Sequence, residues 1–287
     1  KCKHRMRRRV QRTEGTAMQK KAAIIQDVSC LGKCSAGVAL PIVSHFDVEC
    51  ALLPTALLSA HTAFRHYTCM DLTEMMRSIC SDWRKEGVRF DGVYSGYMLS
   101  EAQIQIAADF IDTFAKEDAF ILVDPVMGDN GKAYAMLSEH YGSTMRCLLK
   151  RADVITPNLT EAALLLGCDP VLSGYTERDV RDMLRALHGM GAKRPMITGV
   201  SFDADEIGVA YLENDKIGYI ADEKLDGVFC GTGDTFASVV FGAMLQGAAM
   251  EDAIHRALRV LNKAMRADPQ WYGIRFEAAL NELKIEN

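Results

Sequence analysis

The sequence predicts an α/β protein whose central, mostly parallel sheet is flanked by helices on both faces. Three observations lead to this prediction. Short apolar runs alternate with longer helical runs, and this alternation favours a parallel sheet covered on both sides. Of the 287 residues, 49% are apolar and 25% are charged, so a large core can form. No repeat or long linker divides the chain, and we expect a single domain from residue 20 to residue 287.

The predicted elements follow one another in the order that such a sheet requires. A buried strand at 22–27 is followed by Gly32 and Ser35, which lead into an apolar helix ending near Val43. An apolar run at 49–54 precedes a 16-residue loop at 55–70, which is long for a compact domain and therefore a candidate functional loop. The remaining elements are a helix at 71–83, strands at 92–95, 119–123, 153–156 and 195–198, helices at 101–114, 158–166, 176–189, 233–246 and 250–266, and a hairpin at 207–213 and 216–221.

Polar residues stand where the predicted strands end. They are Asp27, Ser95, Asp124, Thr156 and Thr198. Ligands of parallel α/β sheets bind beyond the carboxyl ends of the strands. The sequence therefore predicts a site at this edge of the sheet.

The stretch Phe229-Cys230-Gly231-Thr232-Gly233-Asp234 turns directly into the helical pattern at 233–246. The glycines allow close backbone approach, and the unpaired N–H groups of the first helical turn attract an anion. Asp234 then fits as a general base beside a bound phosphoryl group. An equally weighted interpretation is a glycine turn with an Asp in the first turn of the helix, where the macrodipole stabilises it.

Two further segments carry carboxylates beside strand ends, Asp124-Pro-Val-Met-Gly-Asp129 and Thr156-Pro-Asn158-Leu-Thr-Glu161. Oxygen ligands of this kind suit Mg²⁺, which binds through one or two carboxylates, waters and substrate phosphates. The alternative for Asn158 and Glu161 is a helix capping box, and both roles are compatible. The alternative for Asp124 is a turn Asp before proline.

Composition excludes several classes of protein. No apolar run reaches the roughly 18 residues of a membrane span. The nine cysteines are scattered without a CxxC pair, so neither a zinc site nor a disulfide framework is indicated, and reduced thiols in a cytoplasmic protein fit best. For Cys230 two interpretations stay open, a thiol whose pKa the helix dipole lowers, or a small buried residue.

Residues 1–19 are predicted to be a disordered basic leader, with Met18 directly before the first strand. Seven basic side chains and no acid stand in residues 1–12, against a net charge of −5 for the chain. Because no RNA-binding pattern accompanies this segment, nucleic acid is not an expected partner. The Walker A and GxGxxG fingerprints are both missing, so phosphate binding is expected at Gly231–Asp234.

Taken in order, these motifs resemble the ribokinase-like (PfkB) superfamily, and most closely its pyridoxal and pyridoxamine kinases. The resemblance also includes Ile25-Gln26-Asp27 with Gly32, Ser59-Ala-His61-Thr62 and Ser95-Gly-Tyr97, and spans residues 20 to 275. It implies a base role for Asp234 toward a substrate hydroxymethyl group. It also implies an anion hole for the γ-phosphate, formed by Gly231, Thr232 and Gly233.

The resemblance implies roles for other residues too. Asp124, Asp129 and Glu161 would surround the triphosphate and Mg²⁺. The nucleotide site would be lined by Thr156, Asn158, Thr198 and Asp226, with Tyr134 over the phosphates. The vitamer would meet Asp27, Thr62 and Tyr97, and His61 of the long loop is a further candidate contact. ATP, Mg²⁺, a monovalent cation such as K⁺ and a homodimer are implied in the same way.

The resemblance therefore predicts an ATP-dependent kinase that phosphorylates pyridoxal, pyridoxamine or pyridoxine. Two positions depart from the pattern. Asp27 replaces the serine usual in vitamin B6 kinases, and Ala60 replaces an asparagine. The alternatives are a hydroxymethylpyrimidine kinase, whose Gly-Ser-Asp pattern in the first strand is absent, and a non-catalytic protein that binds B6 or nucleotide.

Overall fold

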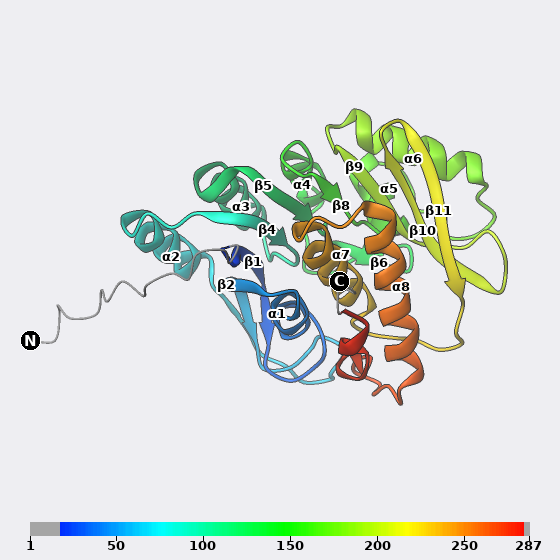
Figure 1. Ribbon diagram of the computed structural model, residues 1–287, viewed down its shortest axis with the longest axis horizontal. Helices are drawn as coiled ribbons and strands as arrows, with labels where there is room; N and C mark the ends of the chain where they lie inside the picture. The colour runs from blue at the N-terminus through cyan, green and yellow to red at the C-terminus, as the bar shows by residue number, and fades with distance from the viewer. Residues whose placement is uncertain (1–17, 284–287) are drawn as a thin grey trace, which may run out of the picture.

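The computed structural model describes residues 18–283, and its centre is a nine-stranded sheet (Figure 1). Six neighbouring strands are parallel, and an antiparallel strand or hairpin extends each side. Across the sheet the order is β11 (Lys216–Glu223), β10 (Glu206–Glu213), β9 (Arg194–Val200), β8 (Val154–Ile155), β5 (Ala115–Val123), β4 (Phe90–Ser95), β1 (Lys20–Ser29), β2 (Val48–Leu58) and β3 (Cys69–Asp71).

Helices cover both faces of the sheet, as the sequence predicts. One face packs against α2 (Thr73–Lys85), α3 (Glu101–Phe114), α4 (Tyr141–Leu149), α5 (Leu159–Leu166) and α6 (Glu177–Gly189). The other packs against α1 (Ala36–His45), α7 (Thr232–Leu245), α8 (Met250–Arg266) and the 3₁₀ segment η1 (Phe276–Leu283). Because side chains alternate along a strand, Ala23 and Ile25 of β1 enter the first core, and Ala22 and Ile24 enter the second. Both faces of the central strands are therefore buried.

The predicted bounds of the loop at 55–70 are wrong at both ends. Strand β2 continues to Leu58, and β3 pairs antiparallel with its last part, so the loop is confined to 59–68. Pro54 and Thr55 suggest that the strand ends there, but Pro54 still pairs in register with Gln26 of β1. Tertiary pairing thus overrides the local signal of proline.

Three further elements were not predicted, namely α4, η1 and a small hairpin of β6 (Gly128–Asp129) and β7 (Lys132–Ala133). The hairpin turns through Asn130 and Gly131, with φ of 50° and 78°, the conformation that makes Asn-Gly a favoured two-residue turn. The predicted leader lies outside the described residues, apart from Met18 and Gln19. Among residues 18–283, no helix combines the length and apolar character needed to cross a membrane.

The predicted polar residues do gather at one edge of the sheet. Backbone hydrogen bonds continue the ladder past the strand ends, from Asp124 N to Ser95 O at 2.9 Å and from Thr198 N to Pro157 O at 2.9 Å. Because the central strands are parallel, Asp27, Ser95, Asp124, Thr156 and Thr198 all lie at their carboxyl ends. Asp234, at the N-terminus of α7, lies at the same edge, since its charge acts on both Asp124 and Cys34.

Candidate active site

The glycine turn before α7 is shaped by a close backbone contact. Gly231 is the N-cap of α7 and has φ of 80°, and a Cβ there would lie 2.2 Å from the carbonyl oxygen of Lys33. Only glycine fits both the left-handed conformation and this contact. Gly233 is exposed, and a Cβ there would meet no atom within 4 Å. The first turn of α7 therefore faces open space, as an anion site requires.

Asp234 lies in this first turn with an altered pKa. The pKa of its carboxyl is raised to about 6: burial raises it most, the backbone N–H of Ser35 lowers it by donating to the carboxylate, and the charge of Asp27 raises it. A carboxylate with a pKa near 6 is ionised at neutral pH and more basic than an ordinary Asp. The arrangement suits a group that accepts a proton.

Ser35 was missed as a site residue by the sequence analysis. It is the N-cap of α1, with φ of 52°, and it also hydrogen-bonds the Asp27 side chain. The N-termini of α1 and α7 thus meet at the two carboxylates. In the sequence, Ser35 looks like an ordinary helix start, and only the fold brings it to Asp234.

Asp124, Thr156 and Glu161 form one side of the site. Asp124 is 6% exposed and accepts a hydrogen bond from Thr156 Oγ1 at 3.0 Å. Burial raises the pKa of Asp124 well above its ordinary value, and the charges of Glu161 and Asp234 add to this. Burial likewise raises the pKa of Glu161 to about 7.

The capping-box interpretation of Asn158 and Glu161 is confirmed. Asn158 Oδ1 accepts from Glu161 N, and Glu161 Oε2 accepts from Asn158 N, each at 2.9 Å. Glu161 Oε1 also accepts from Met127 N at 3.0 Å, and Asn158 Nδ2 donates to Gly128 O at 2.9 Å. Glu161 therefore fixes the turn 127–128 that leads to Asp129.

Asp129 lies in strand β6 of the small hairpin, and Tyr134 directly follows strand β7. Both are exposed. Although the Tyr134 side chain as a whole is 41% exposed, partial desolvation of its hydroxyl raises the pKa of that group, and the charges of Glu161, Asp129, Asp234 and Asp124 contribute to the rise. Tyr134 therefore lies within electrostatic reach of four site carboxylates.

Magnesium fits this donor set. In the part of the chain that the structure describes, no group of three His, Cys, Asp or Glu side chains is arranged to hold a metal by itself. Mg²⁺ usually keeps several waters and takes substrate phosphates as ligands. The charge of Glu161 raises the pKa of Asp124, and the charge of Asp129 raises the pKa of Glu161, so a divalent cation placed among these carboxylates would relieve their repulsion. Because both Glu161 oxygens already accept N–H groups, this side chain suits a metal-bound water.

Asp27, Tyr97 and the loop 59–68 form the opposite side. Asp27 stands at a bulge of β1, where the register with β2 shifts, and it is 3% exposed. Burial raises the pKa of Asp27. Burial also raises the pKa of Tyr97 to about 12, with Asp27 as the first charge that contributes, so these two side chains are neighbours. Bulges often re-aim a side chain next to an active site.

Four other residues were predicted to contact substrate or nucleotide, namely His61, Thr62, Thr198 and Asp226. His61 packs on Gly32, whose Cβ would come within 2.7 Å of the His61 Cβ, and burial lowers the pKa of its imidazole. Thr62 is exposed on the same loop. Thr198 is half-buried beside Pro157, and Asp226 is exposed between β11 and α7. Their roles toward substrate or nucleotide stay predictions.

Several buried polar atoms near this edge of the sheet have no hydrogen bond among the described residues. They are Gln26 Oε1 and Nε2, Asp27 Oδ1, the Tyr94 hydroxyl and Ser95 Oγ. Buried polar groups are nearly always hydrogen-bonded, so a cluster of exceptions marks a functional or hydrated region. Gln26 packs on Gly96, whose Cβ would lie 2.4 Å from Gln26 Nε2.

The two thiols nearest the turn are not activated. Burial raises the pKa of Cys230, and the charge of Asp129 adds to this. Burial raises the pKa of Cys34 to about 12, with a further contribution from the charge of Asp234. Neither thiol is a nucleophile at neutral pH, because the thiolate is the reactive form.

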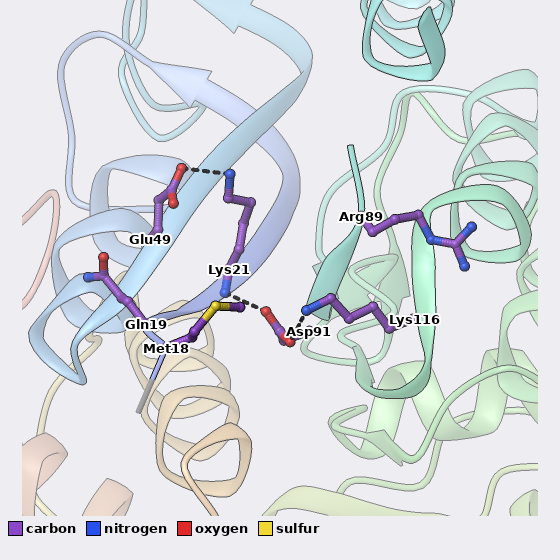
Figure 2. A pocket seen from close by; sticks show the side chains of 7 residues that line it. All are labelled: Met18, Gln19, Lys21, Glu49, Arg89, Asp91 and Lys116. Atoms are coloured by element: carbon purple, nitrogen blue, oxygen red, sulfur yellow. Dashed lines mark hydrogen bonds and ion pairs between the residues drawn. The ribbon is translucent and has the colours of Figure 1, made fainter. Parts of the chain in front are cut away.

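A surface hollow of about 380 Å³ lies at the amino ends of the central strands (Figure 2), whereas Asp234 lies at the opposite edge of the sheet. Four of its charged side chains form ion pairs: Lys21 Nζ lies 2.9 Å from Glu49, and Asp91 accepts from Lys116 Nζ and also from Lys21 N, while Arg89 donates to the backbone oxygen of Ala115. It is lined by Met18, Gln19, Lys21, Glu49, Arg89, Asp91 and Lys116. In parallel sheets ligand sites lie at the other edge, so we place the candidate active site at Asp234.

Comparison with known proteins agrees with this geometry. Residues 43–275 match the family model described as phosphomethylpyrimidine kinase. The chain belongs to this family. A pyridoxine kinase of Bacillus subtilis is 28% identical over 183 residues, which are 63% of this chain and 66% of that protein, just under two thirds.

Two solved structures extend the comparison. A Bacteroides thetaiotaomicron protein described as a phosphomethylpyrimidine kinase, in a crystal form with pyridoxal, is 35% identical with a TM-score of 0.88, over 94% of this chain and 98% of that one. The pyridoxal kinase of Lactobacillus plantarum is 30% identical with a TM-score of 0.85, over 93% and 97%. The predicted ribokinase-like fold and the resemblance to pyridoxal kinases are confirmed, and the names support a kinase.

Proposed function

We propose that this protein is an ATP-dependent kinase that phosphorylates the hydroxymethyl group of a vitamin B6 vitamer. The observation that carries the proposal is the Asp234 carboxyl, with a pKa of about 6, in the first turn of α7 beside the open Gly231–Gly233 turn. A carboxylate in front of unpaired N–H groups suits removal of an alcohol proton next to a bound phosphoryl group.

The two sides of the site suit different parts of this reaction. Asp124, Glu161 and Asp129 would hold Mg²⁺, whose charge neutralises the triphosphate. Asp27 and Tyr97 would contact the vitamer ring. Asp234 would accept the hydroxyl proton as the alcohol oxygen attacks the γ-phosphorus, and the N–H groups of the α7 first turn would stabilise the charge on the transferred group. Crystallisation of the Bacteroides protein with pyridoxal supports a B6 vitamer as acceptor.

The same-site alternative is a hydroxymethylpyrimidine kinase, which the description of the family model favours. A side-by-side assay of ATP consumption with pyridoxal, pyridoxamine, pyridoxine and hydroxymethylpyrimidine separates the two. We expect turnover with at least one vitamer to exceed that with hydroxymethylpyrimidine. Preference for the pyrimidine would assign the alternative instead.

The base role is tested by Asp234→Asn, which keeps the size of the side chain and removes its basicity. We expect kcat to fall by about 10²–10⁴-fold, the usual contribution of general-base catalysis. Binding of a non-hydrolysable ATP analogue, measured by calorimetry, should change by less than about twofold, because the substitution leaves the backbone N–H groups of the α7 first turn in place. Undiminished turnover in this variant would rule out Asp234 as the base.

A further inference from the structure

A tight turn at residues 270–273 contacts both the loop 59–68 and the turn 230–234. Gln270 and Gly273 bond each other's backbone, at 3.1 and 3.0 Å, with Trp271 and Tyr272 at the tip. The turn is pressed against the β1–α1 loop, since a Cβ on Gly273 would lie 2.3 Å from the Lys33 Cβ. This packing leaves the turn little freedom to move independently.

One flank of the turn is bonded to the phosphate-binding element. Ile274 N donates to Cys230 O at 3.1 Å, and Cys230 Sγ lies 3.7 Å from Trp271 O. Cys230 directly precedes Gly231, the N-cap of α7. A shift of the glycine turn is therefore transmitted to the backbone of Trp271.

The tip of the turn is packed against the acceptor loop 59–68. The Phe64 ring lies 4.5 Å from the Trp271 ring and 5.6 Å from the Tyr272 ring, measured between centroids, and the last two rings are 5.5 Å apart. Phe64 N donates to His61 O, so the same loop turn carries the predicted substrate contacts His61 and Thr62. We call Phe64, Trp271 and Tyr272 the aromatic bridge.

Trp271 is 60% exposed, so its ring does little for the core. Its contacts with the aromatic bridge have a geometry that is favourable for aromatic pairs. An exposed tryptophan held between a substrate loop and a phosphate turn is placed to couple them rather than to stabilise the fold.

We propose that Trp271 is a positioning residue that couples the acceptor loop 59–68 to the phosphate turn 230–234. The proposal rests on the proposed function for the identity of the acceptor. The coupling itself, from Phe64 through Trp271 to Cys230, follows from contacts of this chain alone. Substitution of Trp271 should therefore weaken use of the acceptor more than binding of the nucleotide.

The kinetic test compares Trp271→Ala with Trp271→Phe and with the matched control Met75→Ala. Met75 is also exposed, at 52%, but lies on α2 away from the turn. We expect Trp271→Ala to raise the KM of the vitamer about tenfold, because it loses both aromatic contacts. The KM of ATP should change by less than about twofold. Trp271→Phe should restore most of the loss, and Met75→Ala should match the parent. An unchanged vitamer KM in Trp271→Ala overturns the proposal.

A spectroscopic test does not depend on the acceptor. The chain has two tryptophans, so Trp83→Phe leaves Trp271 as the sole reporter. A non-hydrolysable ATP analogue should change the Trp271 emission, since the phosphate turn is bonded to its backbone. Unchanged emission at a nucleotide concentration that calorimetry shows to be saturating overturns the proposal.

The two tests also separate failure of this inference from failure of the proposed function. If no vitamer is phosphorylated but nucleotide still changes the Trp271 emission, the proposed acceptor is wrong and the link to the phosphate turn stands. The KM comparison is then made with hydroxymethylpyrimidine, where the same tenfold rise supports the coupling and its absence overturns it.

Discussion

The two sides of the candidate site are built in opposite ways. On the proposed nucleotide side, Glu161 and Asn158 exchange hydrogen bonds and hold the turn 127–128 through Met127 N and Gly128 O. On the proposed acceptor side, Gln26 has both amide atoms buried without a hydrogen-bond partner among the described residues, and Asp27 has one such oxygen. A fully bonded network rigidifies its surroundings, whereas unpaired buried groups retain the capacity to bind something else.

The hydrogen bonds of Glu161 and Asn158, on the proposed nucleotide side, are therefore satisfied within the chain itself. These side chains serve the fold as well as the ligand, so mutations there should affect stability and binding together. The acceptor side should show the reverse, with large effects on specificity and small effects on stability. The following experiments test whether the two sides differ in this way.

The largest loss of stability is expected at the turn between the two sides. Gly231→Ala places a Cβ against the Lys33 carbonyl in a left-handed conformation, so we expect the free energy of unfolding to fall by about 3 kcal/mol. Gly233→Ala is the matched control, because its Cβ enters open space. Chemical denaturation should show Gly233→Ala within about 0.5 kcal/mol of the parent, while its KM for ATP rises. Equal stability of the two variants would contradict the close-contact argument.

The next prediction compares the loss of stability caused by one substitution on each side of the site. Glu161→Ala leaves the N–H groups of Met127 and Asn158 without their acceptors, and we expect a net loss of about 2 kcal/mol of unfolding free energy. Asp27→Asn removes a buried charge with an unpaired oxygen, so stability should stay within about 0.5 kcal/mol of the parent or increase. Both are measured by urea denaturation. A greater loss in Asp27→Asn would reverse the comparison.

Part of the pH dependence of stability should come from Asp124 and Glu161. The pKa of Glu161 is raised to about 7 and that of Asp124 is raised above its ordinary value near 3.8. The native state therefore binds protons more tightly than the unfolded chain, and this stabilisation is lost as pH rises from about 4 through 7. We expect Asp124→Asn to reduce the fall in Tm between pH 5 and pH 8 by a few degrees. The exposed Asp118→Asn serves as the control, and an identical fall in all three proteins would refute the assignment.

The smallest expected effect is a shift in the pH profile of kcat/KM. Asp234, with a pKa of about 6, should give an acid limb in kcat/KM near pH 6, below which activity falls as the base is protonated. Because the charge of Asp27 helps to raise this pKa, Asp27→Asn should move the limb to lower pH. Initial rates between pH 4.5 and pH 8 measure it. A limb that stays in place or moves upward would show that Asp27 does not act on Asp234.

The fold class, most of the helices and strands of the sheet, and the edge at which polar residues gather could be predicted from the sequence, whereas β3, α4, η1 and the β6–β7 hairpin could not. These follow from local patterns: apolar runs, the Gly231–Asp234 turn and the Asn158 capping box are each written in adjacent residues. The ordered set of motifs was also specific enough to identify the family. The extent of the 59–68 loop was misjudged, because β3 pairs with the end of β2 only in three dimensions.

The assembly of the site depends on tertiary contacts that the sequence pattern does not contain. Ser35 reaches Asp234 because the N-termini of α1 and α7 meet, and Trp271 reaches Phe64 across about two hundred residues of chain. The raised pKa of Asp234 and Glu161 likewise depends on burial, which a linear pattern does not contain. Such properties arise from contacts between segments that are distant in sequence, and no local periodicity reports on them.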